Sequence, residues 1–162
     1  MTRGLVFATA TLGSLALAFS STCLAQTATN AAGEALLVAQ GGGFIFNYRE
    51  ARAHYGLAVK PQRALPADAV IEARFDNPAG GPAIVAIRPF DGTPRPIILE
   101  TPPVTGIRRG IDYRVVVEVK APSGVILGGF TKTYQSDLDQ AVLPKEPLVI
   151  GPGYDRNPSA KP

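Results

Sequence analysis

All fifteen prolines of this 162-residue chain lie between Pro61 and Pro162. A proline inside a helix costs about 3 kcal/mol, because it removes a backbone donor and clashes with the preceding turn. Few proline-free windows in this region are long enough for a helix to avoid that cost. The last hundred residues are therefore predicted to form short strands joined by turns.

Six segments of this region have the composition of strands: 69–75, 83–88, 96–100, 111–120, 125–134 and 147–150. The clearest pattern is in 111–120, where every odd-numbered residue is apolar and four of the five even-numbered residues are charged. Since side chains alternate across a strand, one face of this strand should be buried and the other exposed to water.

A turn is predicted between the fourth and fifth of these segments. Ala121-Pro122-Ser123-Gly124 has proline at the second position and glycine at the fourth, as a β-turn prefers, and should fold the next strand back as a hairpin. The pair Gly128-Gly129 inside the returning strand predicts a bulge or a close approach of two backbones.

Short strands at this spacing predict an all-β fold, because an antiparallel sheet with one apolar face must cover that face with another layer. We expect a single immunoglobulin-like antiparallel β-sandwich of about seven short strands, with a small β-barrel as the alternative. The two cysteines and the tryptophan that mark true immunoglobulin domains are absent, since the chain has one Cys and no Trp.

Residues 1–25 have every part of a secretory signal peptide. Arg3 supplies the positive start, residues 4–19 are uncharged and largely apolar, and residues 20–25 are mostly small, with Cys23 and Ala25 at the positions that precede cleavage. Cleavage is predicted after Ala25, and the protein is then expected in the periplasm. The alternative is lipid attachment at Cys23 and an anchor in the outer membrane. Against this alternative, Ser20-Ser21-Thr22 has no Leu three residues before Cys23 and no Gly or Ala immediately before it, as lipidated cysteines usually have.

The remaining boundaries follow from composition. Residues 26–43 are small and polar and end in three glycines, so they are predicted to be a flexible leader. The sandwich is expected over 44–150, starting with an alternating segment at 44–48; residues 49–55 could form two helical turns closed by Gly56 or could continue the extended chain. Residues 151–162 are expected to be a disordered tail.

Few catalytic groups are available after residue 25. His54 is the single histidine, and the serines are Ser123, Ser136 and Ser159, none of them in a nucleophile motif. Asp137 and Asp139 are the closest carboxylate pair, and their spacing suits a loop in which they accept bonds from backbone N–H groups. We therefore expect no enzymatic activity, no cofactor and no metal site.

The same composition limits the partners. Removal of residues 1–25 leaves 15 basic and 13 acidic side chains, too balanced for a nucleic-acid surface. The basic corner Arg108-Arg109 is a candidate contact for an acidic partner, with solvated turn charge as the alternative. We expect binding to another envelope or secreted protein, and membrane contact only if Cys23 carries a lipid. The alternative function is a small-molecule or metal carrier with a pocket lined by Tyr48, Tyr55, Tyr113 and Tyr134.

Two segments resemble the YbaY-like envelope proteins. The phrase Arg63-Ala64-Leu65-Pro66 followed by Ala69-Val70 is similar to the one before the opening strand of that family. The segment 107–134 is similar as well: Tyr113 leads a long strand, Ser123-Gly124 turns, and the returning strand carries Thr131 and Tyr134. The resemblance spans about residues 60–150 and implies an immunoglobulin-like sandwich in the periplasm, usually lipid-anchored, in a family that includes a type III secretion pilotin. It implies no catalytic residues.

Overall fold

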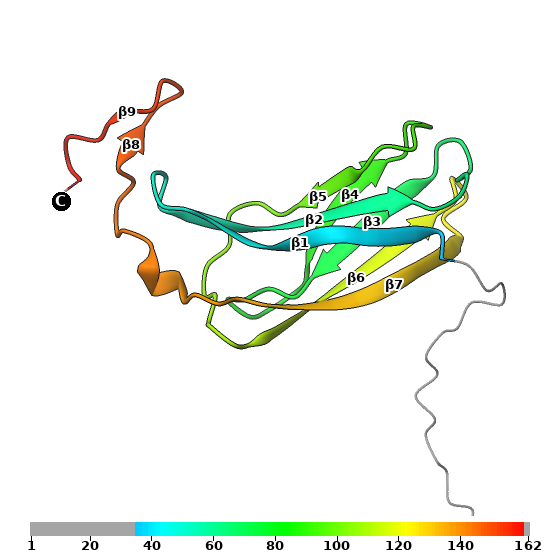
Figure 1. Cartoon of the computed structure of the whole chain (residues 1–162), viewed down its shortest axis with the longest axis horizontal. Coiled ribbons are helices and arrows are strands. Elements are labelled where there is room, and N and C mark those ends of the chain that lie inside the picture. The colour runs from blue at the N-terminus through cyan, green and yellow to red at the C-terminus, as the bar shows by residue number, and fades with distance from the viewer. Residues whose placement is uncertain (1–34, 161–162) are drawn as a thin grey trace, which may run out of the picture. The chain divides into compact units, whose positions relative to one another are not determined.

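The computed structural model describes residues 35–160, which contain nine strands and one short 3-10 helix (Figure 1). The elements are β1 (Leu37–Asn47), β2 (Arg52–Pro61), β3 (Val70–Phe75), β4 (Ile84–Pro89), β5 (Ile97–Glu100), β6 (Asp112–Lys120), β7 (Ile126–Gln135), η1 (Gln140–Val142), β8 (Val149–Ile150) and β9 (Asp155–Arg156).

Seven of the strands form two antiparallel sheets, in the orders β1-β2-β5 and β4-β3-β6-β7. The sheets stack with β1 next to β7 and β4 next to β5. The immunoglobulin-like β-sandwich is confirmed, and the alternative of a small barrel is wrong, because the strands divide between two separate sheets. In constant-type immunoglobulin domains the fourth strand pairs with the fifth, whereas here β4 pairs with β3.

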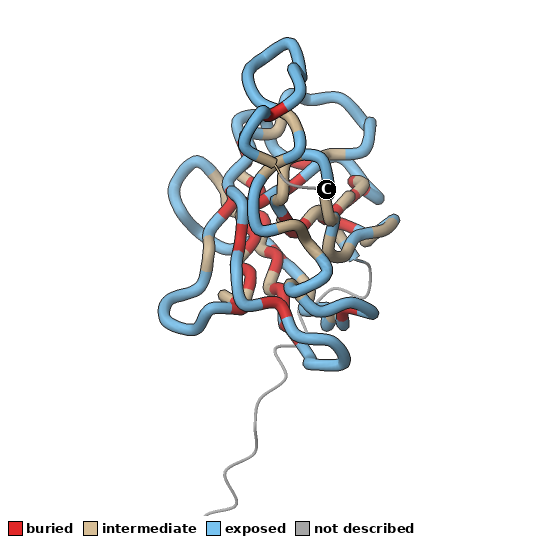
Figure 2. The backbone as a smooth tube through the Cα atoms, turned by 90° about the vertical axis from the view of Figure 1, so that its left-hand side faces the viewer, coloured by how far each residue is buried: buried red, intermediate tan, exposed pale blue. Residues whose placement is uncertain are grey.

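All six predicted strand segments are strands, with ends that differ by one or two residues. In β6 the alternation holds as expected, since Tyr113, Val115, Val117 and Val119 are buried. Among the odd-numbered residues of 111–120, only Ile111 is exposed, and it precedes the strand. Figure 2 shows the buried parts of the chain in the interior and the exposed loops around them.

Aromatic rings fill one part of the space between the sheets. Tyr55 on β2 lies edge-on against Phe44 of β1, with ring centroids 4.1 Å apart, and against Phe75 of β3 at 5.2 Å. Tyr113 of β6 packs against Phe44 at 5.1 Å. These edge-to-face contacts join both sheets through apolar burial and ring electrostatics.

The prediction of a flexible leader over 26–43 is wrong for residues 37–43, which are the first part of β1 and pair with β2; residues 26–34 lie outside the described residues. The three glycines have a structural role here. A Cβ atom on Gly42 would lie 2.6 Å from the Gly56 carbonyl oxygen and 2.8 Å from Tyr134 Oη, and its φ of 154° disfavours other residues. Glycine therefore allows β1 to approach β2 and β7 closely.

Residues 49–55 form no helix, and only 52–55 are extended, as the start of β2. The chain turns at 48–51, where the Asn47 side-chain oxygen accepts hydrogen bonds from the N–H groups of Arg49 and Glu50. Ala51 has a positive φ of 52° at the end of this turn. Gly56 lies in the middle of β2, opposite Gly43, and does not end a helix.

The β6–β7 hairpin has the predicted turn. The N–H group of Gly124 donates to the Ala121 carbonyl at 2.8 Å, and Gly124 has a φ of 84°. The register of β7 shifts between Ile126 and Gly128, and a Cβ atom on Gly129 would lie 2.1 Å from the Val117 carbonyl oxygen. The Gly128-Gly129 pair therefore accompanies both a bulge and a close backbone approach.

The prediction of a disordered tail over 151–162 is wrong for the residues that the structure describes, which end at 160. β9 pairs with β8, and the Asn157 side chain donates to the Pro147 carbonyl at 2.7 Å. The N–H groups of Leu148 and Val149 both donate to the Arg49 carbonyl in the β1–β2 turn, at 2.8 and 3.2 Å. These bonds satisfy the backbone of a segment that has little apolar burial of its own.

Candidate functional site

The predicted basic corner lies in the connection between β5 and β6. Arg108 and Arg109 are exposed, and their backbone N–H groups donate to Tyr113 Oη at 2.8 Å and to Asp139 Oδ1 at 3.0 Å. The first bond is a tyrosine corner, in which a tyrosine at the start of the sixth strand is bonded to backbone a few residues upstream. The second confirms, for Asp139, the predicted bond to a backbone N–H. The corner therefore has a fixed backbone that supports two exposed guanidinium groups.

The four tyrosines do not line one pocket, so the predicted aromatic pocket is wrong. Tyr55 and Tyr113 are buried in the core, Tyr134 reaches from β7 to Gly42, and Tyr48 is exposed in the β1–β2 turn. Burial raises the pKa of Tyr55 far above its usual value, with the nearby Tyr113 as the next cause. Its hydroxyl donates to the Asp76 carbonyl at 3.0 Å, so this polar group is satisfied inside the sandwich.

The other chemistry-bearing residues are dispersed. His54 Nε2 pairs with the Glu100 carboxylate, while the Ser136 hydroxyl donates to the Leu138 carbonyl at 2.6 Å. Within residues 35–160 no three His, Cys, Asp or Glu side chains are grouped as a metal site would require. Cys23, the candidate for lipid attachment, lies outside the described residues.

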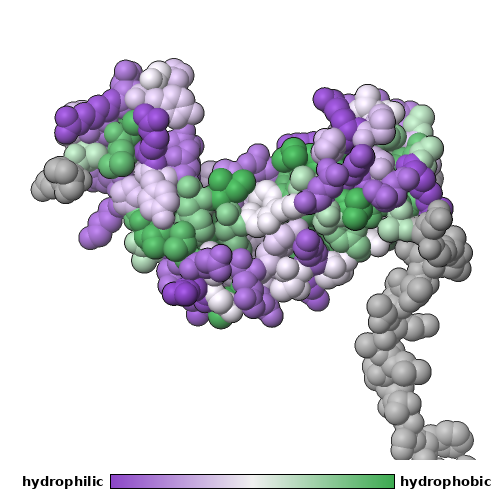
Figure 3. Space-filling view, viewed as in Figure 1, coloured by the Kyte–Doolittle hydropathy of each residue, from purple (hydrophilic) through white to green (hydrophobic). Residues whose placement is uncertain are grey.

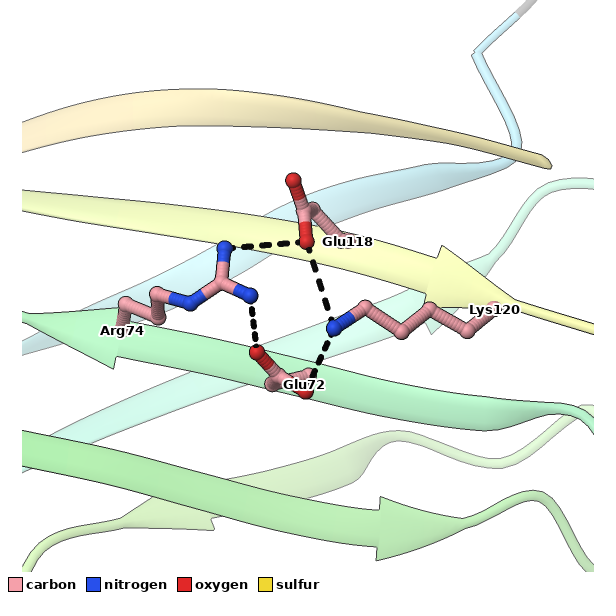
Figure 4. Close-up of polar contacts among 4 residues, drawn as sticks. All are labelled: Glu72, Arg74, Glu118 and Lys120. Atoms are coloured by element: carbon pink, nitrogen blue, oxygen red, sulfur yellow. Dashed lines mark hydrogen bonds and ion pairs between the residues drawn. The ribbon is translucent and has the colours of Figure 1, made fainter. Parts of the chain in front are cut away.

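Four charged side chains form a network on the outer face of the β4-β3-β6-β7 sheet (Figure 4). Arg74 contacts Glu72 at 2.5 Å and Glu118 at 3.0 Å, and Lys120 contacts the same two carboxylates at 2.6 and 3.5 Å. The hydrogen bond from Lys120, assisted by Arg74, holds the pKa of the Glu72 carboxyl below its usual value. Because every charge has a partner of opposite sign, this cluster stabilises the sheet and offers little to a ligand.

The outer face of the β1-β2-β5 sheet is different, because much of it is apolar. The register places Gly41, Gly43 and Ile45 on this face opposite Ala58, Gly56 and His54, and Ile98 lies opposite Ala58 on the other side. Ile45 and Ile98 are 48% and 53% exposed. The outward residues of a sandwich strand are usually polar, so this face departs from the expected pattern.

A shallow groove of about 380 Å³ runs over these residues, and we call it the sheet groove. Its floor is low because Gly41, Gly43 and Gly56 have no side chains, and Ile45 and Ile98 are among its lining residues. The His54–Glu100 pair lies on the same face, next to Ile45 and Gly56. In Figure 3, apolar and neutral surface extends along the path that β1 follows in Figure 1.

The sheet groove was not predicted from the sequence, although two segments contain a signal for it. In Phe44-Ile45-Phe46 and in Ile97-Ile98-Leu99 both faces of the strand are apolar, so one apolar residue in each must point away from the core. The predicted residues Arg108 and Arg109 belong to the β5–β6 connection, and none of the lining residues of the sheet groove comes from it.

Comparison with models of known protein families, with curated proteins and with solved structures found no match for this chain. The similarity to YbaY-like proteins therefore stays a prediction. In the part of the chain that the structure describes, no helix has the length and apolarity needed to cross a bilayer.

Proposed function

We propose that this protein is an exported, non-enzymatic β-sandwich that binds another envelope or secreted protein through the sheet groove. The observation that carries the proposal is the exposed apolar face at Ile45 and Ile98 above a floor of glycines. Contiguous exposed apolar surface on a domain usually marks an interaction site, whereas single exposed apolar residues do not. Export is supported by the signal-peptide pattern of residues 1–25.

The shape of the sheet groove favours an extended polypeptide segment as the bound part of the partner. A glycine floor lets another backbone approach closely, and two exposed isoleucines provide apolar contacts beside it. Arg52 and Lys60 lie on the same face of β2, so acidic residues that flank the bound segment would be attracted to it. This role agrees with the scaffold or pilotin-like function that the YbaY-like resemblance implies.

Site-specific photocrosslinking in cells tests the proposal. A photoreactive side chain in place of Ile98 should form an adduct of defined mass with one partner. The matched control replaces Val85, which is similarly exposed on the outer face of the other sheet, and should give no such adduct. Equal adducts from both positions, or none from either, would contradict the proposal.

A second variant separates partner binding from small-molecule carriage. Ile98→Asp places a charge at the groove and should weaken capture of the partner at least about tenfold, since burying an aliphatic side chain contributes about 1.5–3 kcal/mol. Native mass spectrometry of the protein from the same cells should show no bound ligand. A retained small molecule that Ile98→Asp releases would favour the carrier function.

A further inference from the structure

The tip of the β6–β7 hairpin exposes three consecutive aliphatic residues. Val125, Ile126 and Leu127 are 60%, 55% and 37% exposed. Exposure of such a run to water is unfavourable, so its presence on the surface of a domain marks an interaction site. The run is separate from the sheet groove, because it belongs to the other sheet.

The hairpin tip also lacks charge. The ten residues from Ala121 to Phe130 contain no ionisable side chain. The nearest charge before them is Lys120, whose ammonium group is 2.6 Å from Glu72 and 3.5 Å from Glu118. No charged group of the tip itself would therefore have to lose its hydration when the tip enters an apolar environment.

This tip lies at the end of the sandwich where the described chain begins. β1 starts at Leu37, opposite the last residue of β2, and Val70 at the start of β3 lies opposite Lys120 just before the turn. The two connections at 62–69 and 90–96 cross between the sheets at this same end (Figure 1). The first described residues, Ala35 and Leu36, therefore lie at the end of the sandwich that carries the tip.

We propose that the tip formed by Val125, Ile126 and Leu127 inserts into the interfacial region of a phospholipid bilayer, so that this end of the sandwich faces the membrane. An exposed, uncharged aliphatic run suits a deformable lipid surface, because interfacial binding requires apolar area and no shaped complementary site. Binding of this kind increases with the apolar area that is buried in the interface. The proposal does not depend on the proposed partner binding, and it requires no lipid on Cys23.

The absence of tryptophan from the chain allows a direct test. Ile126→Trp and Ile111→Trp each give the full chain a single tryptophan, whose emission can be excited apart from that of the five tyrosines. Ile111 is 43% exposed but lies beyond the opposite end of β6, about 30 Å away for nine strand residues. Each protein is mixed with vesicles of phosphatidylethanolamine and phosphatidylglycerol whose acyl chains carry bromine at defined depths.

The tryptophan at position 126 should shift its emission to the blue and be quenched by bromine at shallow depth, while the tryptophan at 111 should be unchanged. Membrane attachment through the N-terminal segment alone would leave both unquenched while the chain sediments with the vesicles, which would overturn the proposal. Equal quenching at both positions, or no binding to the vesicles, would overturn it as well.

A second pair of substitutions tests whether the native aliphatic neighbours of position 126 contribute to insertion beside the introduced tryptophan. In the Ile126→Trp chain, Val125→Ser together with Leu127→Ser should raise the lipid concentration for half-maximal quenching at least about tenfold. Val85 lies on β4, so Val85→Ser in the same chain should leave the lipid concentration for half-maximal quenching unchanged. Circular dichroism should show an unchanged fold in every variant, and equal quenching of all variants would contradict insertion of the tip.

Discussion

Tyr113 and Tyr134 lie opposite each other on β6 and β7, yet their hydroxyl groups have different surroundings. Tyr113 Oη accepts a hydrogen bond from the Arg108 N–H and fixes the connection between the sheets. Tyr134 Oη is buried against Gly42 and has no hydrogen-bond partner among the described residues. Burial raises the pKa of Tyr134, because the phenolate would lose its hydration there.

Removing the two hydroxyls should therefore have different effects. Tyr113→Phe should lower the free energy of unfolding by about 1 kcal/mol, because the Arg108 N–H loses its acceptor. Tyr134→Phe should leave the free energy of unfolding unchanged or raise it by up to about 1 kcal/mol, since it removes an unpaired buried hydroxyl. Urea denaturation followed by circular dichroism measures both. A larger loss for Tyr134→Phe than for Tyr113→Phe would contradict these assignments.

At the scale of elements, the pairing of β3 with β6 places two carboxylates directly opposite each other. Glu72 and Glu118 are cross-strand partners, an arrangement that is unfavourable for like charges. Arg74 and Lys120 lie two residues along each strand on the same face and contact both carboxylates (Figure 4). The diagonal cations convert a repulsive pair into a closed network.

This network predicts a pH dependence of stability. The pKa of Glu72 is lowered in the folded state, so its contribution is present above the usual pKa of about 4.3 and is lost as the pH falls through the lowered value. Glu72→Gln should lower the free energy of unfolding by about 1 kcal/mol at neutral pH, and this difference should vanish at about pH 2.

Glu146→Gln is the matched control for the acid titration, because Glu146 is exposed in the segment before β8. Its free energy of unfolding should equal that of the unmodified protein from neutral to acidic pH. If the difference in the free energy of unfolding between Glu72→Gln and the unmodified protein stays constant down to about pH 2, the carboxylate charge does not have this role.

At the scale of the whole described domain, strands lie beyond the predicted limits of 44 and 150 at both ends. Leu37 is buried in the core, and residues 37–43 supply the first part of the β1–β2 pairing. At the other end, β8 is bonded to the β1–β2 turn through the Arg49 carbonyl, and Arg49 lies 5.9 Å from the centre of the Tyr154 ring. The β1–β2 hairpin therefore connects the core with the C-terminal strands.

Shortening the chain tests the part of β1 that resembles a leader. A protein that begins at Phe44 should lose at least about 3 kcal/mol of unfolding free energy relative to one that begins at Ala35, because burial of Leu37 and seven residues of strand pairing are removed. Thermal and urea denaturation of the two proteins provide the comparison. Equal stability would show that residues 37–43 do not hold the sandwich together.

Strands with one apolar face were predictable because their alternation is a local property of the sequence. In 111–120 the period of two identifies both the strand and its buried face, and Pro122 with Gly124 identifies the turn. The glycines of 41–43 were misread because composition alone does not distinguish a tether from a close packing contact. The sheet groove was missed because Ile45 and Ile98 are separated by more than fifty residues. They lie on one surface only because β1 and β5 both pair with β2.

After Pro61, the sequence by itself determined that the chain forms short antiparallel strands, since the prolines exclude long helices and the alternation selects a buried face. Only the tertiary structure decided which apolar residues remain exposed. That outcome depends on how strands distant in the chain pair and stack, because a side chain is buried only where a second layer covers it. The exposed isoleucines of the sheet groove and the aliphatic tip at 125–127 are apolar residues that no layer of the described domain covers.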